Sequence, residues 1–156
     1  MVVFIDLAKA FDTVDHNILL NKLKNYGGRG IYLKLLKSYL EGRQQYGPLL
    51  FLVYIDDMKY CSNILHLVLF ADDTNFFLMS NNLNFLITTV NMELDKLLNW
   101  FKANKLSLNR EKTNFILFKS ARHRLQATME VKIDGVAIKR VKNCKFLEII
   151  IDENLT

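Results

Sequence analysis

LHLVLFADDTNFFLM, residues 65–79, is the most informative part of this 156-residue sequence. Its two strand-like runs, Leu65 to Phe70 and Asn75 to Met79, lie on either side of Ala71-Asp72-Asp73-Thr74. Runs of this length and composition that are separated by a few polar residues indicate a β-hairpin. We therefore expect two paired strands, with the carboxyl groups of Asp72 and Asp73 in the turn between them.

A third acidic group follows the first apolar run of the chain. Val2-Val3-Phe4-Ile5 has the composition of a buried strand, and Asp6 comes directly after it. If this strand neighbours the hairpin, Asp6, Asp72 and Asp73 converge at one edge of a sheet. Carboxylates that lie close together repel each other, which raises their pKa values unless cations neutralise them. Oxygen ligands suit Mg²⁺, and two such ions about 3.5–4 Å apart can activate a hydroxyl and stabilise leaving pyrophosphate.

The alternative is that these acids merely occupy turns, as aspartate often does. The pair Asp56-Asp57 offers a comparison, because it also follows an apolar run but precedes Lys59 and Tyr60 rather than a second strand. We interpret that pair as the surface end of a helix. The strands on both sides of Asp72 and Asp73 favour metal binding there.

The rest of the pattern predicts an α+β fold, in which one antiparallel sheet carries helices on one face. Asp12 and Thr13 are expected to cap the first helix, with Asp15 as an acid in its first turn. Asp134-Gly135 indicates a tight turn between two strands. Helices are expected at 14–25, 31–40 (ended by Gly42), 49–58 and 83–103, and strands at 114–119, 131–133, 136–138 and 145–151.

Composition narrows the functional classes. Hydrophobic residues make up 51% and charged residues 24%, which is a globular balance. No apolar run approaches the roughly 20 residues of a membrane span, and no signal peptide opens the chain, so we expect an intracellular protein, in nucleus or cytoplasm, without a membrane partner. Cys61 and Cys144 are expected to be single buried thiols, and no Cys/His cluster suggests zinc.

Charge is distributed unevenly along the chain. The net charge is +5, and residues 101–156 carry twelve Lys or Arg against six Asp or Glu. A basic tract beside an acidic centre fits a polyanion that is held near a metal site, while a solvated surface is the alternative.

Five segments resemble, in order, the motifs of one family. Val3 to Val14 resembles the first palm motif of reverse transcriptases of non-LTR (LINE-type, jockey-like) retrotransposons, and Leu69 to Thr74 resembles their Phe/Tyr-Ala-Asp-Asp motif. Gly47 to Ile55 is similar to the helix before that motif. Trp100 to Asn109, together with Glu111-Lys112-Thr113, resembles the motif that comes next in the family. Lys145 to Leu147, together with Ile149 to Asp152, resembles the primer-grip region. Five motifs in register over nearly the whole chain make the resemblance specific.

The resemblance implies a polymerase palm that copies RNA into DNA, with an RNA template, a DNA primer and deoxynucleoside triphosphates as partners. It assigns metal binding and catalysis to Asp6, Asp72 and Asp73, which would hold two Mg²⁺ ions, with Mn²⁺ as the alternative. Lys112 matches a lysine that protonates leaving pyrophosphate; an exposed lysine near a strand start is the alternative.

Further positions take their roles from the same resemblance. Phe11 matches the aromatic residue that excludes a ribose 2′-hydroxyl, and Leu7 is expected beside it at the nucleotide; a core aromatic is the alternative for Phe11. Primer and template contacts are expected at Phe146, Leu147, Lys105 and Arg110; for Phe146 and Leu147, a place in the core is the alternative.

Departures from the family pattern concern both ends and the middle of the chain. A segment bearing Pro-Gln-Gly-Ser normally precedes Gly47-Pro48, but here Tyr46 joins Gly47 directly, which implies an internal deletion at 46–47. The family glycine after Phe-Leu is Glu148, and Asp56 stands where asparagine is common. We expect residues 1–156 to be one partial palm domain, without fingers, thumb or endonuclease, in which the reaction is impaired because both reactants must be positioned.

Two other interpretations stay open. An inert remnant of the element would at most bind nucleic acid through its basic C-terminal third, in a salt-dependent manner that does not need the aspartates. A nucleotidyl cyclase-like palm would share the sheet and the metal pair, although no triphosphate-binding lysine pattern supports it.

Overall fold

The computed structural model describes residues 1–41, 48–70, 73–118, 130–147 and 149–154. Its main sheet has five strands in the order β2-β3-β1-β4-β7, which are His66–Phe70, Asp73–Phe77, Val2–Ile5, Asn114–Ile116 and Lys139–Arg140. All neighbours are antiparallel except β4 and β7. The expected antiparallel sheet is confirmed, and the first strand occupies its centre.

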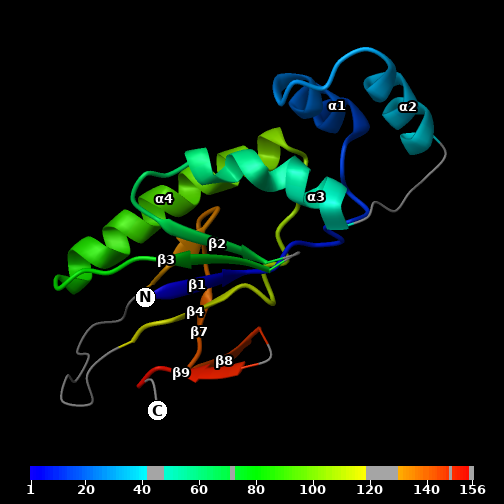
Figure 1. Ribbon diagram of the computed structural model, residues 1–156. Coiled ribbons are helices and arrows are strands. Elements are labelled where there is room, and N and C mark those ends of the chain that lie inside the picture. The colour runs from blue at the N-terminus through cyan, green and yellow to red at the C-terminus, as the bar shows by residue number, and fades with distance from the viewer. Residues whose placement is uncertain (42–47, 71–72, 119–129, 148, 155–156) are drawn as a thin grey trace.

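Two helices cover one face of this sheet (Figure 1). They are α3 (Pro48–Ile55) and α4 (Leu83–Ala103), and the expected range of α4 is confirmed to the residue. The main core lies beneath them, where Leu94, Leu97 and Phe101 of α4 pack with Val3 and Phe115 of the sheet. The 3₁₀ turn η1 (Asp56–Tyr60) follows α3, where the sequence had predicted a continuous helix to Met58.

The helices α1 (His16–Asn25) and α2 (Ile31–Leu40) lie beyond α3 (Figure 1). Lys22 connects α1 to α3 and η1, because its ammonium group donates to Asp57 at 2.7 Å and to the carbonyl oxygen of Tyr54 at 2.6 Å. The same group lies 4.9 Å and 4.8 Å from the ring centroids of Tyr54 and Trp100. Burial lowers the pKa of this ammonium group.

The expected start of the first helix was wrong. Asp15, rather than Asp12 or Thr13, is the N-cap, and its side chain accepts hydrogen bonds from the backbone N–H groups of Asn17 and Ile18. The carbonyl oxygen of Lys9 instead accepts from Asp12 and Thr13, which keeps them in the preceding turn. Gly42 and the junction at 46–47 lie outside the described residues.

The last expected strand was also wrong, because residues 143–152 form a hairpin. β8 (Asn143–Phe146) pairs with β9 (Ile149–Asp152), and Leu147 adopts a left-handed φ of 47° at the turn. The sequence carries no Gly, Asn or Pro there to signal a turn. This hairpin lies on the face of the sheet opposite the helices (Figure 1), where Phe146 and Cys144 pack against a small cluster of Val2, Phe4 and Ile116.

The tight turn at Asp134-Gly135 is confirmed. β5 (Lys132–Ile133) pairs with β6 (Val136–Ala137), and both turn residues have positive φ, 55° and 74°. The strand that was expected at 114–119 ends at Ile116, and Lys119 lies outside the described residues. Cys61 and Cys144 are free thiols, although both are half-buried rather than buried.

Candidate active site

Two of the three expected carboxylates lie at the same edge of the sheet. The register that pairs Ile5 with Thr74 brings Asp6 opposite Asp73, one step beyond the last pair. Asp73 is the first residue of β3 rather than part of the turn, and both side chains line one cavity of about 150 Å³ on the hairpin side of the sheet. Asp72 lies outside the described residues, so its expected position stays a prediction.

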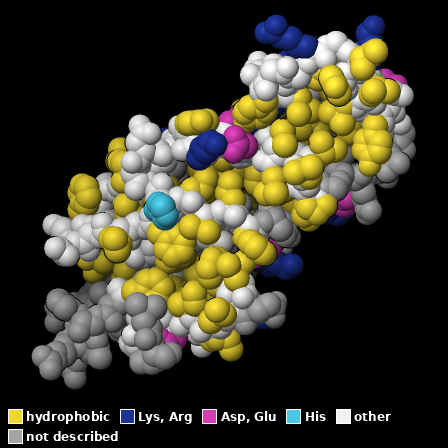
Figure 2. All heavy atoms as spheres, viewed as in Figure 1, with side chains coloured by type: hydrophobic (Ala, Val, Ile, Leu, Met, Phe, Trp, Pro, Cys, Tyr) yellow, Lys and Arg dark blue, Asp and Glu magenta, His cyan; other side chains and the backbone are white. Residues whose placement is uncertain are grey.

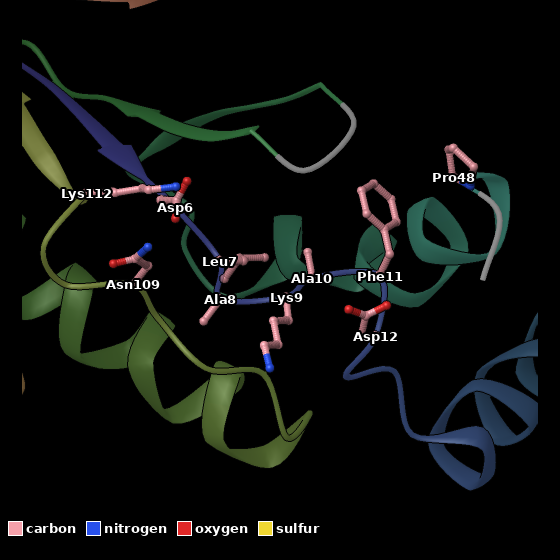
Figure 3. A pocket seen from close by; sticks show the side chains of 10 residues that line it. All are labelled: Asp6, Leu7, Ala8, Lys9, Ala10, Phe11, Asp12, Pro48, Asn109 and Lys112. Carbon is pink, nitrogen blue, oxygen red and sulfur yellow. The ribbon is translucent and has the colours of Figure 1, made fainter. Parts of the chain in front are cut away.

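A turn that precedes β4 holds Asp6 in place. The backbone N–H of Asn109 donates to the carbonyl oxygen of Asp6 at 2.9 Å, and the N–H of Asp6 donates to the Thr113 hydroxyl at 3.4 Å. That hydroxyl donates in turn to the carbonyl oxygen of Asn109 at 2.8 Å, and Thr113 is fully buried. The turn therefore carries Lys112 to a position from which its side chain extends toward the Asp6 carboxylate (Figure 3).

A larger cavity of about 760 Å³ opens beside Asp6 (Figure 3). It is lined by the segment from Asp6 to Asp12, together with Pro48, Asn109 and Lys112. Leu7 is buried in its wall, whereas Phe11 is half-buried and packs on Phe51 of α3, with ring centroids 5.1 Å apart. The two residues that were expected at the nucleotide thus share one cavity with Asp6 and Lys112.

Some residues that line this cavity carry groups of the kind that bind anions. Within the described parts of the chain, the backbone N–H groups of Lys9, Ala10 and Phe11 donate to no other group. Lys9 and Lys112 line the same cavity, and neither forms an ion pair with a described residue. Lys9 also holds a left-handed φ of 51°, which is uncommon for a residue with a side chain. Successive backbone N–H groups in such turns form anion-binding concavities.

The residues that were expected at the primer lie near Asp73. Phe146 packs on Phe4, with ring centroids 6.2 Å apart, and lines the 150 Å³ cavity with Asp6 and Asp73. Leu147, at the tip of the hairpin, lines a separate cavity of about 330 Å³ with Asp73 and Phe70. Cys144 also lines the smaller cavity, and burial, followed by the charge of Asp73, raises the pKa of its thiol.

Lys105 and Arg110 do not line these cavities. Lys105 forms an ion pair with Asp15 at 2.5 Å, and Arg110 forms one with Asp134 at 2.6 Å. Asp56 and Asp57 pair with Lys59 and Lys22, which confirms their interpretation as surface acids beyond a helix. Several basic residues of the C-terminal third are thus neutralised by ion pairs, among them Lys102 with Asp134 and Arg140 with Glu153.

Several site residues went unrecognised in the sequence. Lys9, Asn109 and Thr113 lie within segments that resemble family motifs, but only their position in the fold shows that they line a cavity or hold Asp6. Asn75 and Asn114 line the smaller cavity from strands on either side of β1. Asn75 follows Asp73 by two residues, and Asn114 follows Lys112 by two. Since residues two apart share one face of a strand, this spacing could have indicated that the two asparagines lie on the same face as the site.

The donor set at this edge fits a hard divalent cation. Asp6 and Asp73 offer carboxylate oxygens from adjacent strand ends, and Mg²⁺ typically takes one or two carboxylates, waters and substrate phosphates rather than a full cage of protein ligands. Among the described residues, no three His, Cys, Asp or Glu side chains come together as a metal cluster. A cation held by Asp6 and Asp73 would therefore take its remaining ligands from elsewhere, water and phosphate included.

An antiparallel sheet with acids at adjacent strand ends and helices on one face is typical of a polymerase palm-like fold, and the chain has that architecture. The family model described as "Reverse transcriptase (RNA-dependent DNA polymerase)" matches residues 1–151. The chain therefore belongs to the reverse transcriptase family.

A fly protein gives a second comparison. "Probable RNA-directed DNA polymerase from transposon BS" of Drosophila melanogaster is 29% identical over 185 residues, which cover 99% of this chain and 20% of the relative. The chain thus spans about a fifth of the length of that relative. Separately, no helix within the described ranges has both the length and the apolar character that crossing a membrane requires.

Proposed function

We propose that this chain is part of the RNA-directed DNA polymerase of a non-LTR, jockey-like retrotransposon. One observation carries the proposal: Asp6 and Asp73, 67 residues apart in the sequence, meet at one rim of the sheet beside Lys112. Its substrates would be an RNA template, a DNA primer and deoxynucleoside triphosphates, which places its work inside the cell.

Asp6, Asp72 and Asp73 would hold two Mg²⁺ ions, for which Mn²⁺ could substitute. Such ions would lower the pKa of the primer 3′-hydroxyl and would stabilise the charge of leaving pyrophosphate. In this proposal the 3′-hydroxyl would lose its proton to water, its oxygen would attack the α-phosphorus, the bond to the bridging oxygen of pyrophosphate would break, and Lys112 would give that oxygen a proton.

The 760 Å³ cavity supplies the nucleotide site in this proposal. The backbone N–H groups of Lys9, Ala10 and Phe11 would donate to the triphosphate, and the ammonium group of Lys9 would balance part of its charge. Phe11, fixed by its contact with Phe51, would close the space beside the sugar of the incoming nucleotide and exclude a 2′-hydroxyl.

The reaction is expected to be slow in this chain, as an internal deletion at 46–47 would imply. The similarity to the fly relative extends over 185 residues, more than the 156 of this chain, so the relative carries residues inside the aligned region that have no counterpart here. Lost positioning of the template and the nucleotide lowers the rate without removing the carboxylates.

Primer extension on an RNA template with Mg²⁺ tests the proposal. Asp6→Asn and Asp73→Asn should each lower incorporation by a factor on the order of 10², because each removes one charge where transition-state charge is stabilised. Asp95→Asn, the same change at an exposed site on α4, should leave the rate unchanged. Equal incorporation by all four proteins would contradict the proposal and favour a nucleic-acid-binding remnant.

A further inference from the structure

Four basic side chains of the α1–α2 segment are not neutralised by any acid that the structure describes. Residues 16–41 hold five Lys or Arg and one acid, Glu41, and Lys22 pairs with Asp57. The other four cations are exposed and form no ion pair with a described residue: Lys24, Arg29, Lys34 and Lys37. A surface that carries unopposed cations attracts polyanions.

The C-terminal third, where basic residues are most numerous in the sequence, differs in this respect. Five of its cations are held in ion pairs with acids: Lys102, Lys105, Arg110, Lys132 and Arg140. Formal charge counted along the sequence therefore indicates the C-terminal third as the surface for a polyanion, whereas α1 and α2 carry charge that remains free to bind one.

The outward side of α2 combines two of these cations with aromatic rings. Its inward side consists of three leucines that are buried or half-buried: Leu33, Leu36 and Leu40. At 3.6 residues per turn, Lys34 and Lys37 lie along one flank of the outward side, while Tyr32 and Tyr39 lie along the other. We call these four residues the α2 face. Figure 2 shows Lys or Arg side chains that protrude beside apolar ones at this end of the molecule.

The two tyrosines of the α2 face expose much of their rings to solvent. Tyr32 is 79% exposed and Tyr39 is 49% exposed. They lie nearly on the same side of the helix, roughly 10 Å apart along its axis at about 1.5 Å per residue. Exposed rings beside a row of cations are the arrangement by which proteins bind unpaired nucleic acid, with bases stacked on the rings and phosphates at the cations.

A single strand matches both flanks of the α2 face. A duplex would offer phosphates to Lys34 and Lys37, but its bases are stacked on each other and do not splay out onto aromatic rings as unpaired bases do. An apolar partner would cover the tyrosines but would leave the two ammonium groups without a counter-charge. The combination of free cations and exposed rings therefore favours an unpaired nucleic acid strand.

The α2 face follows closely on the larger cavity. Residues 13–15 alone separate the cavity-lining segment Asp6–Asp12 from α1, and α1 contacts α2. The Phe11–Asp12 end of the cavity adjoins the chain that leads into α1 (Figure 3). In templated synthesis the copied part of a template is paired, while the part still to be copied is unpaired and extends away from the nucleotide site. A strand that leaves the cavity at this end would continue toward α1 and α2.

We propose that the α2 face binds the unpaired part of the template RNA that is still to be copied. Its phosphates contact the ammonium groups of Lys34 and Lys37, and its bases stack on the rings of Tyr32 and Tyr39. The role as a template site rests on the proposed function, whereas the binding of a single strand rests on the α2 face alone.

A labelled RNA that forms no secondary structure tests this inference by fluorescence anisotropy, without divalent cations and over a series of salt concentrations. The double variant Lys34→Gln with Lys37→Gln should raise Kd on the order of tenfold at low salt. It should also reduce the slope of log K against log salt by about 1.4, since each contact with a single-stranded phosphate contributes roughly 0.7. Tyr32→Leu should raise Kd on the order of tenfold without changing the slope, because it removes a ring and no charge.

Matched controls remove the same groups at other surfaces. Lys102→Gln with Lys132→Gln lowers the net charge equally, but at lysines that are already ion-paired. Tyr60→Leu removes a ring that is 75% exposed on η1. Both control proteins should bind RNA with nearly the wild-type affinity and slope, and the Tm of every variant should stay close to that of the wild type.

Three results would overturn the inference. The first is an α2-face variant that binds RNA as tightly as its control. The second is an equal loss of affinity in the two lysine double variants, which would mean that net charge alone attracts the strand. The third is weakened binding of the α2-face variants to vesicles of anionic lipid while their RNA binding is unchanged, which would make α2 a membrane-binding helix instead.

Primer extension separates failure of this inference from failure of the proposed function. If extension depends on Asp73 while the α2-face variants bind RNA normally, only this inference is wrong. If the α2-face variants lose RNA binding but extension does not depend on Asp73, the proposed function is wrong. The single-strand surface then stands, and its role as a template site falls with the proposed function.

Discussion

At the level of single residues, the proposed active site depends on contacts that join distant parts of the chain. Thr113 contacts Asp6 across 107 residues of sequence, through a hydroxyl that accepts from Asp6 and donates to Asn109. These bonds fix both the strand end that carries Asp6 and the turn that carries Lys112. We therefore expect Thr113 to be a positioning residue for Asp6 and Lys112.

Thr113→Val keeps the shape of the side chain but removes its hydroxyl. Incorporation in primer extension should fall through kcat, by about tenfold, while KM for the nucleotide changes little, because the geometry of Asp6 is lost and the nucleotide cavity is kept. Thr113→Ser should restore most of the rate. A variant that loses stability but keeps its kcat would show that the hydroxyl serves the fold alone.

The sequence predicted site residues correctly where an acidic side chain directly follows or begins a recognisable strand. Asp6 and Asp73 stand at the ends of recognisable strands, so their meeting could be predicted from the pattern of apolar runs. Lys112 required the family resemblance, and its approach to Asp6 depends on Thr113, which no local pattern reveals. The ion pairs of Lys105 and Arg110 with Asp15 and Asp134 could not be foreseen either, because each partner is distant in sequence.

At the level of elements, helix caps and turns were the least predictable features. The first helix begins after Asp15 because that side chain satisfies two N–H groups and also pairs with Lys105. The hairpin of β8 and β9 was missed because its turn residue, Leu147, is not a typical turn former. By contrast, α4 was predicted over its whole length because its apolar residues recur at helical spacing and Asn82 caps it.

The cap of α1 should make stability depend on pH. A hydrogen bond from Lys105 holds the pKa of Asp15 below its ordinary value of 3.8. A carboxylate with a lowered pKa in the folded state adds stability above its unfolded pKa, and this contribution is lost as pH falls through the folded pKa. Urea unfolding should show Asp15→Asn to be less stable than wild type by about 0.5–1 kcal/mol at pH 7.

The difference between these two proteins should shrink steadily below about pH 4. The asparagine side chain can still accept hydrogen bonds from the backbone N–H groups of Asn17 and Ile18, so the substitution tests the negative charge of Asp15. Asp95→Asn, at an exposed position, should follow the wild type at every pH. A constant gap between wild type and Asp15→Asn from pH 7 to pH 3 would rule out the charge as its source.

At the level of the whole molecule, the end formed by α1 and α2 exposes much apolar surface (Figure 2). Ile31, Tyr32 and Leu35 of α2 are 71%, 79% and 64% exposed. Contiguous apolar surface of this kind promotes association. Leu35→Lys should therefore reduce self-association in sedimentation experiments while Tm stays within about a degree, because little buried contact is lost. A clear fall in Tm would show instead that Leu35 is packed within the folded monomer.

The central position of β1 has a consequence for how this chain tolerates insertions and deletions. Val2–Ile5 pairs with β3 on one side and with β4 on the other, so one four-residue strand aligns Asp6 with both Asp73 and the Lys112 turn. Adding or removing a single amino acid within it would rotate Asp6 to the opposite surface of the sheet. Gain or loss of a single codon at this point would therefore separate Asp6 from both Asp73 and Lys112 at once, although every charged residue was still encoded.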